Sequence, residues 1–297
     1  MLARIQQMIV LALLSGEAVA IALAAFLGVP LLAAIVPLAA AGGYVVVLAV
    51  EFWILRHSYA PSDPLRPRIR ELVTAWIGEV FAAPRVFLWR QPFFENEIVD
   101  QLDEFSRGRR GVVLVHGFFC NRAIWNPWLI RLKRQQVPFI AVNLEPVFGS
   151  IDDYRATIAA AVDRLRDATS LPPVIVAHSM GGLAVRAWLA TRGDPAVVHR
   201  VVTIASPHAG TRLARRSVAR NIAEMRIGSA WLADLSSRER SAARSRFICF
   251  WSHCDNIVFP TRSATLQEAD NRHLPATAHV KMVRHPAPID AVLELVT

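Results

Sequence analysis

The nine residues 174–182, Val-Ile-Val-Ala-His-Ser-Met-Gly-Gly, constrain the fold of this chain more than any other stretch. The first three are β-branched, which is typical of a buried strand, and residues 183–189 have apolar side chains at helical spacing. Ser179 therefore falls in a sharp turn between a strand and a helix. Such a turn strains its central residue and needs small neighbours, because two backbones pass close together there. Gly181 and Gly182 meet this need.

The string Ala-His-Ser-Met-Gly-Gly resembles the nucleophile elbow of α/β-hydrolase lipases and esterases, with Ala177 where the usual Gly-x-Ser-x-Gly pattern has its first glycine. The resemblance covers residues 108–297. It implies an α/β-hydrolase fold, a mostly parallel sheet flanked by helices, with Ser179 as the nucleophile. Strand-like and helical runs alternate along this part of the chain, and that pattern also predicts a parallel sheet covered on both faces.

A second strand-like run, 112–115, ends in His116-Gly117-Phe118. In the lipases that the chain resembles, the loop after this strand supplies one donor of the oxyanion hole. The resemblance therefore implies that the backbone N–H groups of Phe118 and Met180 bind the oxyanion. His116 is expected to shape the loop rather than to act as a base.

An acid loop is indicated by the string Asp-x-x-Val-x-Pro, which begins at Asp255 directly after the apolar run 247–251. This string is similar to the loop that carries the triad acid in the family, so the resemblance implies Asp255 as the acid. Asp234 and Asp270 are the competing candidates. The first lies in the cap region described below, and no strand is predicted before the second.

The base of the triad is expected shortly before the last helix, as in the enzymes that the chain resembles. His279 fits this position, and His285, six residues later, is the alternative. His208, in a Pro-His-x-Gly-Thr string that is similar to a lipase hallmark, is a third candidate. It precedes every candidate acid, however, whereas the family order is serine, acid, histidine.

A cap is expected over residues 212–243, which are rich in arginine and helical in pattern. An insertion at this point of the fold typically covers the pocket. The segment is either an amphipathic lid that opens at a lipid surface or a fixed surface helix packed on the core, and the sequence leaves both open.

The N-terminal residues 1–55 hold two apolar runs, 5–28 and 31–55, each longer than the ~20 residues that cross a bilayer. We expect a membrane hairpin. The alternatives are a cleaved signal peptide followed by one span, or peripheral or buried helices. Arginines flank the outer ends and the turn is uncharged, so a bacterial inner-membrane protein with a cytoplasmic catalytic domain is predicted. Residues 56–107 are expected to form a linker and an aromatic-rich extension, which either covers the core or lies in the headgroup region.

Composition narrows the possible partners. The net charge is +9, and almost all the cationic residues are arginines. No basic stripe is interleaved with aromatic residues, so no nucleic-acid partner is expected. The charge is either attracted to anionic headgroups or scattered over the surface. No Cys/His spacing typical of zinc and no phosphate-binding glycine loop occurs, so we expect no metal and no cofactor. The odd number of cysteines, three, favours free thiols.

These features together predict a membrane-anchored serine hydrolase that cleaves carboxylic esters, with a lipid or other acyl ester as substrate and the bilayer as partner. Two alternatives stay open. One is a thioesterase or acyltransferase that uses the same triad. The other is a membrane-anchored scaffold whose hydrolase fold does not turn over.

Overall fold

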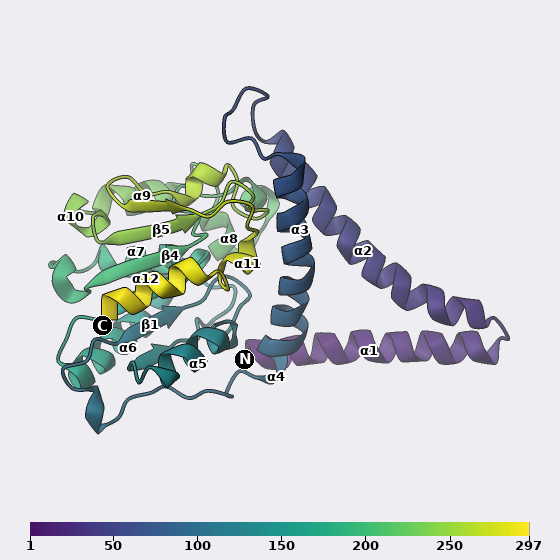
Figure 1. The fold of residues 1–297 in the computed structure, drawn as a ribbon, viewed down its shortest axis with the longest axis horizontal. Coiled ribbons are helices and arrows are strands. Elements are labelled where there is room, and N and C mark those ends of the chain that lie inside the picture. Colours follow the sequence, from purple (N-terminus) through teal and green to yellow (C-terminus); the bar gives the residue numbers. More distant parts are fainter. Residues whose placement is uncertain (297) are drawn as a thin grey trace.

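The sheet at the centre of the molecule is parallel throughout, in the strand order β2-β1-β3-β4-β5-β6 (Figure 1). The computed structural model describes residues 1–296. The strands are β1 (Val112–Val115), β2 (Phe139–Ala141), β3 (Val174–His178), β4 (Arg200–Ile204), β5 (Phe247–Trp251) and β6 (Asp270–His273). The helices of this domain are α5 (Asn126–Arg134), α6 (Arg155–Thr169), α7 (Met180–Leu189), α8 (Arg220–Glu224), α9 (Ala230–Arg238), α10 (Ser241–Arg244), α11 (His279–Met282) and α12 (Pro286–Val296).

Successive strand residues point to opposite faces of the sheet, and both faces are covered. Val113 and Ile175 pack on one face with α6 and α7, whereas Val112 and Val174 pack on the other with α5 and α12. The central strands are therefore buried on both sides, which explains their continuous apolar sequences. The predicted α/β fold with a parallel sheet flanked by helices is confirmed.

The edge strand β6 was not predicted. All four of its residues, Asp-Asn-Arg-His, are exposed, so it carries no apolar pattern. It pairs with β5, Ile248 opposite Asp270 and Trp251 opposite His273. Asp270 is the first residue of β6, so it begins a strand and does not follow one.

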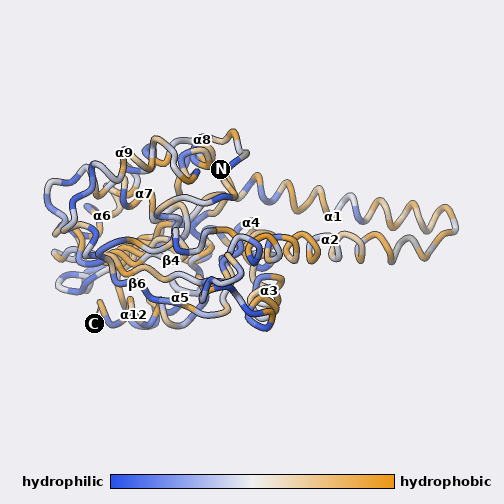
Figure 2. The backbone as a smooth tube through the Cα atoms, turned by 90° about the horizontal axis from the view of Figure 1, so that it is seen from above, coloured by the Kyte–Doolittle hydropathy of each residue, from blue (hydrophilic) through white to orange (hydrophobic). Residues whose placement is uncertain are grey.

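Two long N-terminal helices project from the α/β domain as a hairpin (Figures 1 and 2). They are α1 (Leu2–Phe26) and α2 (Pro30–His57), joined by a turn in which Gly28 has a φ of +69°. Figure 2 shows that the hairpin is mostly hydrophobic, and many of its large apolar side chains are exposed. The hairpin therefore has no protein core of its own to bury these side chains.

A third helix, α3 (Ile69–Pro84), stands between the hairpin and the α/β domain (Figure 1). It continues through a π-helical turn (Arg85–Arg90) into α4 (Gln91–Phe93). By length and composition, three helical segments are apolar enough to cross a membrane, namely Leu2–Phe26, Ile35–His57 and Ile69–Phe93. The sequence predicts the first two as spans and the third only as part of the extension.

The aromatic residues of this extension divide between the two environments considered for them. Trp76 and Phe87 are partly buried against apolar clusters of the domain, whereas Trp89 is 60% and Phe93 42% exposed. Neither a covering role nor an interfacial one describes the whole segment.

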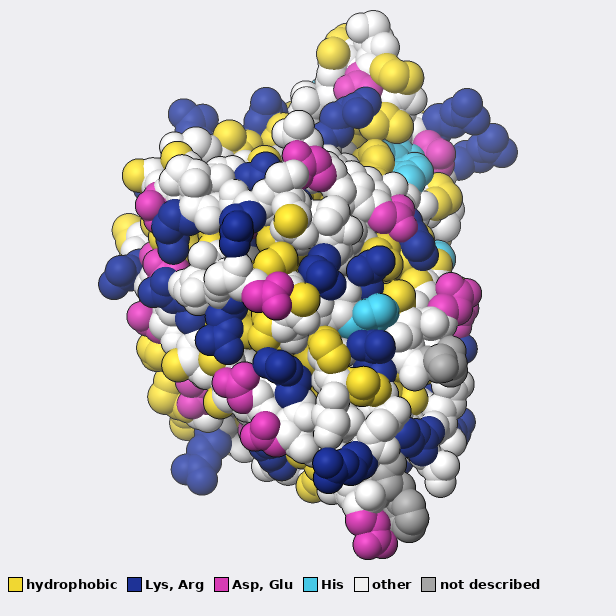
Figure 3. Space-filling view, turned by 90° about the vertical axis from the view of Figure 1, so that its left-hand side faces the viewer, with side chains coloured by type: hydrophobic (Ala, Val, Ile, Leu, Met, Phe, Trp, Pro, Cys, Tyr) yellow, Lys and Arg dark blue, Asp and Glu magenta, His cyan; other side chains and the backbone are white. Residues whose placement is uncertain are grey.

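Charged residues of both signs are spread over the face of the domain that points away from the hairpin (Figure 3). Arginine and lysine side chains alternate there with acidic and apolar ones. On this face the arginine and lysine side chains are therefore scattered among acidic and apolar ones rather than gathered into one basic patch.

Residues 212–243 form a short 3-10 turn (Arg212–Arg216), α8, α9 and α10. The Glu224 carboxylate accepts hydrogen bonds from the hydroxyl of Ser150 (2.7 Å) and the N–H of Ile151 (2.7 Å). Leu232 and Leu235 of α9 are buried in the apolar cluster on the α6/α7 face of the sheet. In this structure the segment thus packs against the domain at both α8 and α9.

The start of α7 packs against the end of β1 with no room for a side chain. A Cβ added at Gly181 would lie 2.5 Å from the carbonyl oxygen of His116 and 2.7 Å from that of Val115. These neighbours are backbone atoms at the centre of the sheet, so they can shift only if the strand shifts.

We therefore predict that Gly181→Ala lowers the free energy of unfolding by about 1–3 kcal/mol, although alanine is the better helix former. Denaturant unfolding of the detergent-solubilised protein measures this. The matched control is Gly193→Ala, where an added Cβ would meet nothing within 4 Å. Equal stability of the Gly181→Ala variant and the wild type would contradict the predicted close packing.

Candidate active site

Ser179 lies at the turn between β3 and α7 with a strained backbone. Its φ is +53° and its ψ is −127°, a region that residues with a side chain rarely occupy. The N–H of Ser179 donates to the carbonyl oxygen of Ile204 on β4 (2.9 Å), which ties the turn to the sheet. This conformation lifts the serine side chain above the carboxyl end of β3, where it lines a cavity.

Two glycines beside Ser179 allow the surrounding loops to close on it. A Cβ at Gly117 would come within 2.9 Å of the Cβ of Ser179, and one at Gly182 within 2.2 Å of the hydroxyl oxygen of Ser206. Ala177, at the position of the usual first glycine, is completely buried, and its methyl group packs in the apolar cluster on the α6/α7 face.

The Asp255 carboxylate is fully buried in the loop after β5. Its Oδ1 accepts hydrogen bonds from the backbone N–H groups of Ile257 (2.9 Å) and Val258 (2.9 Å). Both carboxylate oxygens also face the Nδ1 of His279, at 3.0 and 3.1 Å. The carboxylate is therefore held in one orientation and directed at the imidazole ring.

His279 begins α11, after the loop that follows β6, and is 5% exposed. Burial alone would lower the pKa of His279, but the charge and hydrogen bond of Asp255, together with the carboxylates of Glu79 and Glu51, hold this pKa above its usual value. With Nδ1–H donating to Asp255, Nε2 is the nitrogen left to accept a proton.

Ser179 and His279 line one cavity of 540 Å³, and the structure has no hydrogen bond between their side chains within residues 1–296. The lining is mostly apolar and comes from α2, α3, the loops after β1 and β4, and the α8 region. Among its described residues, Glu51 and Glu79 are the charged members and neither lysine nor arginine contributes.

Phe118 lines the same cavity as Ser179, and Met180 directly follows Ser179 in the chain. Phe118 belongs to the cavity wall, and Met180 is the first residue of α7, at the positive end of the helix dipole. In the part of the chain that the structure describes, neither N–H donates to another protein group.

Comparisons with known proteins identify the family and the fold of the chain. A model of the alpha/beta hydrolase family matches residues 112–293. The chain belongs to this family. Among curated proteins none matches the sequence.

Solved structures of lipases share the fold of this hydrolase. Bacillus licheniformis lipase BlEst2 in its mature form superposes with a TM-score of 0.56 at 16% identity, over 67% of this chain and 95% of that one. Aspergillus fumigatus lipase B superposes with a TM-score of 0.59 at 18% identity, over 67% of this chain and 55% of that one. At such identities the likeness establishes the fold alone.

The competing acids of the hydrolase lie away from the cavity. Asp234 is an exposed residue of α9 that pairs with Arg238, and Asp270 is exposed on β6 and pairs with Arg272. Among the described residues 1–296, neither forms a hydrogen bond or an ion pair with a histidine.

The competing bases are also engaged elsewhere. His285 accepts a hydrogen bond from the N–H of Ala287 at the start of α12. His208 is buried behind the cavity, with its Nε2 3.0 Å from the hydroxyl oxygen of Thr203. Burial and the nearby charge of Arg186 hold the pKa of His208 well below its usual value.

His116 shapes the loop after β1. Its Nε2 accepts from the N–H of Leu144 (3.0 Å), so its Nδ1 carries the proton and donates to the carbonyl oxygen of Gly117 (2.9 Å). Complete burial lowers the pKa of His116 to about 4, and the ring is therefore neutral. It links the loop that carries Phe118 to the loop after β2.

Four residues at the site were not expected there. Asn256 directly follows Asp255, and His178 directly precedes Ser179. Both line the cavity, as do Glu51 of α2 and Glu79 of α3. The ring of His178 lies 4.8 Å from that of His279, and burial first, then the charge of His279, lowers the pKa of His178. A carboxylate inside an apolar helix indicates a residue that needs a polar partner. The sequence alone does not show that this partner lies at the active site, because the helices and the site are far apart along the chain.

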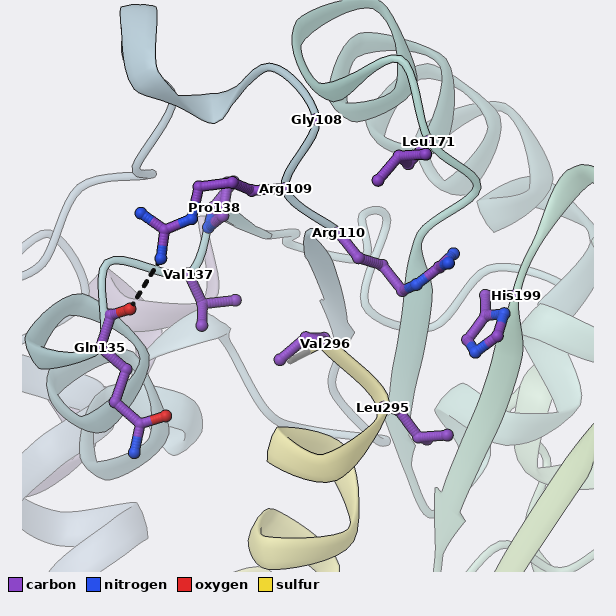
Figure 4. A pocket seen from close by; sticks show the side chains of 10 residues that line it. All are labelled: Gly108, Arg109, Arg110, Gln135, Val137, Pro138, Leu171, His199, Leu295 and Val296. Carbon is purple, nitrogen blue, oxygen red and sulfur yellow. Dashed lines mark hydrogen bonds between the residues drawn. The ribbon is translucent and has the colours of Figure 1, made fainter.

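A second cavity, of 470 Å³, lies at the opposite edge of the sheet (Figure 4). Its wall includes Arg109, whose guanidinium donates to the carbonyl oxygen of Gln135 (3.1 Å), together with Arg110 and His199. None of the described residues that line the cavity at Ser179 also lines this second cavity. No group of three or more His, Cys, Asp or Glu side chains within residues 1–296 is arranged to hold a metal ion, and all three cysteines are free and buried.

Proposed function

We propose that this hydrolase cleaves carboxylic esters through an acyl-enzyme, with lipid esters as its substrates. One observation supports the proposal above all. The strained Ser179 lines the same apolar cavity as His279, which is paired with the buried Asp255. An apolar cavity of 540 Å³ beside three apolar N-terminal helices suits an acyl chain better than a polar substrate.

In the first half of the reaction, His279 Nε2 accepts the proton of Ser179 Oγ while this oxygen attacks the ester carbonyl carbon. The carbonyl oxygen becomes an oxyanion, which the N–H groups of Phe118 and Met180 bind. Asp255 keeps Nδ1 protonated and stabilises the imidazolium. Collapse of the intermediate breaks the bond to the leaving alkoxide, which takes the proton from Nε2.

In the second half, His279 Nε2 removes a proton from water, and the resulting hydroxide attacks the acyl carbon. Collapse of this intermediate breaks the bond to Ser179 Oγ, which recovers its proton from His279. The products are one alcohol and one carboxylic acid per ester, so the reaction balances without a metal or cofactor.

Ser179→Ala is expected to lower kcat roughly 10⁶-fold, to background, since it removes the nucleophile. The assay is hydrolysis of p-nitrophenyl esters from acetate to palmitate by the detergent-purified full-length protein. The wild type should prefer medium or long chains, because they fill the apolar cavity.

Equal, near-background rates for the wild type and the variant would remove the ester-hydrolase proposal. Reaction with an active-site fluorophosphonate then separates what remains. Labelling of the wild type at Ser179 would indicate a thioesterase or acyltransferase, whereas absence of labelling would indicate a scaffold.

The dependence of kcat/KM on pH is expected to report the His279 imidazole. The base must be neutral, so activity should rise with pH through a pKa above the ordinary ~6.5. Asp255→Asn removes the charge that raises this pKa. We predict a fall in kcat of about 10⁴-fold and an acid limb shifted to lower pH.

Asp270→Asn is the matched control, because Asp270 is the exposed competing acid on β6. It should change neither rate nor pH profile. The opposite pattern, with Asp270→Asn inactive and Asp255→Asn active, would contradict the proposed triad.

We also propose that α1 and α2 cross a bacterial inner membrane, with the catalytic domain in the cytoplasm. Arginines lie before α1's apolar run and after α2, and the turn between them has no charge. A cysteine introduced by Leu27→Cys, at an exposed turn position, should react in intact cells with a membrane-impermeant maleimide.

A cysteine introduced by Val218→Cys, which is 99% exposed on the catalytic domain, should react only after lysis. The native cysteines are buried and give little background. The reverse labelling pattern would overturn the proposed orientation.

A further inference from the structure

The loop that carries His279 is held by carboxylates from outside the catalytic domain. Oε1 of Glu79, on α3, accepts from the N–H of Val280 (2.9 Å), and its Oε2 accepts from the N–H of Lys281 (3.0 Å). Glu79 is only 2% exposed. Both oxygens of one buried carboxylate therefore clamp the two amides that directly follow His279.

The amide of His279 itself is held through a second carboxylate. Its N–H donates to Oδ1 of Asn256 (3.2 Å), and Nδ2 of Asn256 donates to Oε2 of Glu51 on α2 (2.8 Å). Asn256 is the neighbour of Asp255, and it is buried. Glu51 thus fixes the side chain that ties the acid loop to the histidine loop.

Apolar packing reinforces these contacts. Phe52 and Leu55 of α2 and Leu72 of α3 form one buried cluster with Phe259 of the acid loop and Ala278, the residue before His279. The ends of α2 and α3 that face the domain are therefore built into the walls of both loops. Three consecutive amides, 279 to 281, depend on groups that these helices hold.

We propose that Glu79 and Glu51 are positioning residues of the active site, so that the N-terminal helices complete the catalytic geometry in addition to anchoring the protein. The inference rests on the proposed function, since it concerns the base of that reaction. Glu79 acts directly on the histidine loop, and Glu51 acts through Asn256. Loss of either lets His279 move relative to Ser179, and a displacement of about 1 Å costs up to ~100-fold in rate.

The test compares kcat and KM for p-nitrophenyl butyrate in full-length, detergent-purified variants. Glu79→Gln keeps one acceptor oxygen and leaves one of the two amides unpaired. We expect kcat to fall roughly 10- to 100-fold with KM within about twofold of the wild type, because the base is displaced while the cavity persists. The rate of fluorophosphonate labelling of Ser179 should fall in parallel.

The Glu51 pair separates positioning from general stability. Glu51→Ala removes the acceptor for Asn256 and should lower kcat several-fold. Glu51→Gln keeps an acceptor oxygen at the same place and should restore most of kcat. Glu17→Gln, a carboxylate on α1 far along the hairpin, serves as the control and should leave kcat unchanged.

Wild-type kcat in both Glu79→Gln and Glu51→Ala would overturn the inference while leaving the proposed function intact. If the Glu79→Gln protein does not fold, the Glu51 pair decides, and equal kcat values for Ala and Gln at position 51 overturn the role of Glu51. If the wild type itself is neither active nor labelled, the proposed function fails, and the inference fails with it.

Discussion

The close approach of three backbones around Ser179 is the constraint on which the rest of this structure depends. The end of β3, the start of α7 and the loop after β1 meet where a single added carbon would collide with carbonyl oxygens at 2.5 and 2.7 Å. A strained residue such as Ser179 costs of order 1–3 kcal/mol and persists only where its surroundings leave no alternative. Here the bond from its N–H to Ile204 and the glycines around it supply that restraint. The parallel sheet then brings the loops after β5 and β6 to the same edge, where they deliver Asp255 and His279.

The sequence predicts the parts of this arrangement that are encoded locally. Buried strands on both sides of the elbow are continuous apolar runs, and the elbow itself needs a serine followed by glycines, so both can be read without a structure. β6 is different. Its four residues are polar and exposed, and only pairing with β5 makes them a strand. The loop that carries His279 follows this strand, which is why position along the chain and family resemblance, rather than any local pattern, pointed to that histidine and left His285 open.

The support of the histidine loop could not be predicted, for a reason of distance. Glu79 and the amides that it binds are 201 and 202 residues apart, and Asn256 and Glu51 are 205 apart. A carboxylate in an apolar helix indicates that a partner is needed, because an unpaired buried charge is costly. The sequence does not show which residue that partner is. The structure pairs Glu51 with Asn256, in the loop beside the acid.

These contacts bear on why the hydrophobic helices are attached to this particular domain. A helix that served only as a tether would leave the loop amides of the catalytic domain to be satisfied within that domain. In this chain the two amides after His279 have a carboxylate of α3 as their acceptor, and the apolar side chains around them come partly from α2. Detaching the helices would leave buried N–H groups without acceptors and open an apolar cluster beside the acid and the base. The cost of both changes falls on the loops that hold Asp255 and His279. The hydrophobic helices and the loops that hold Asp255 and His279 are thus parts of one packed structure.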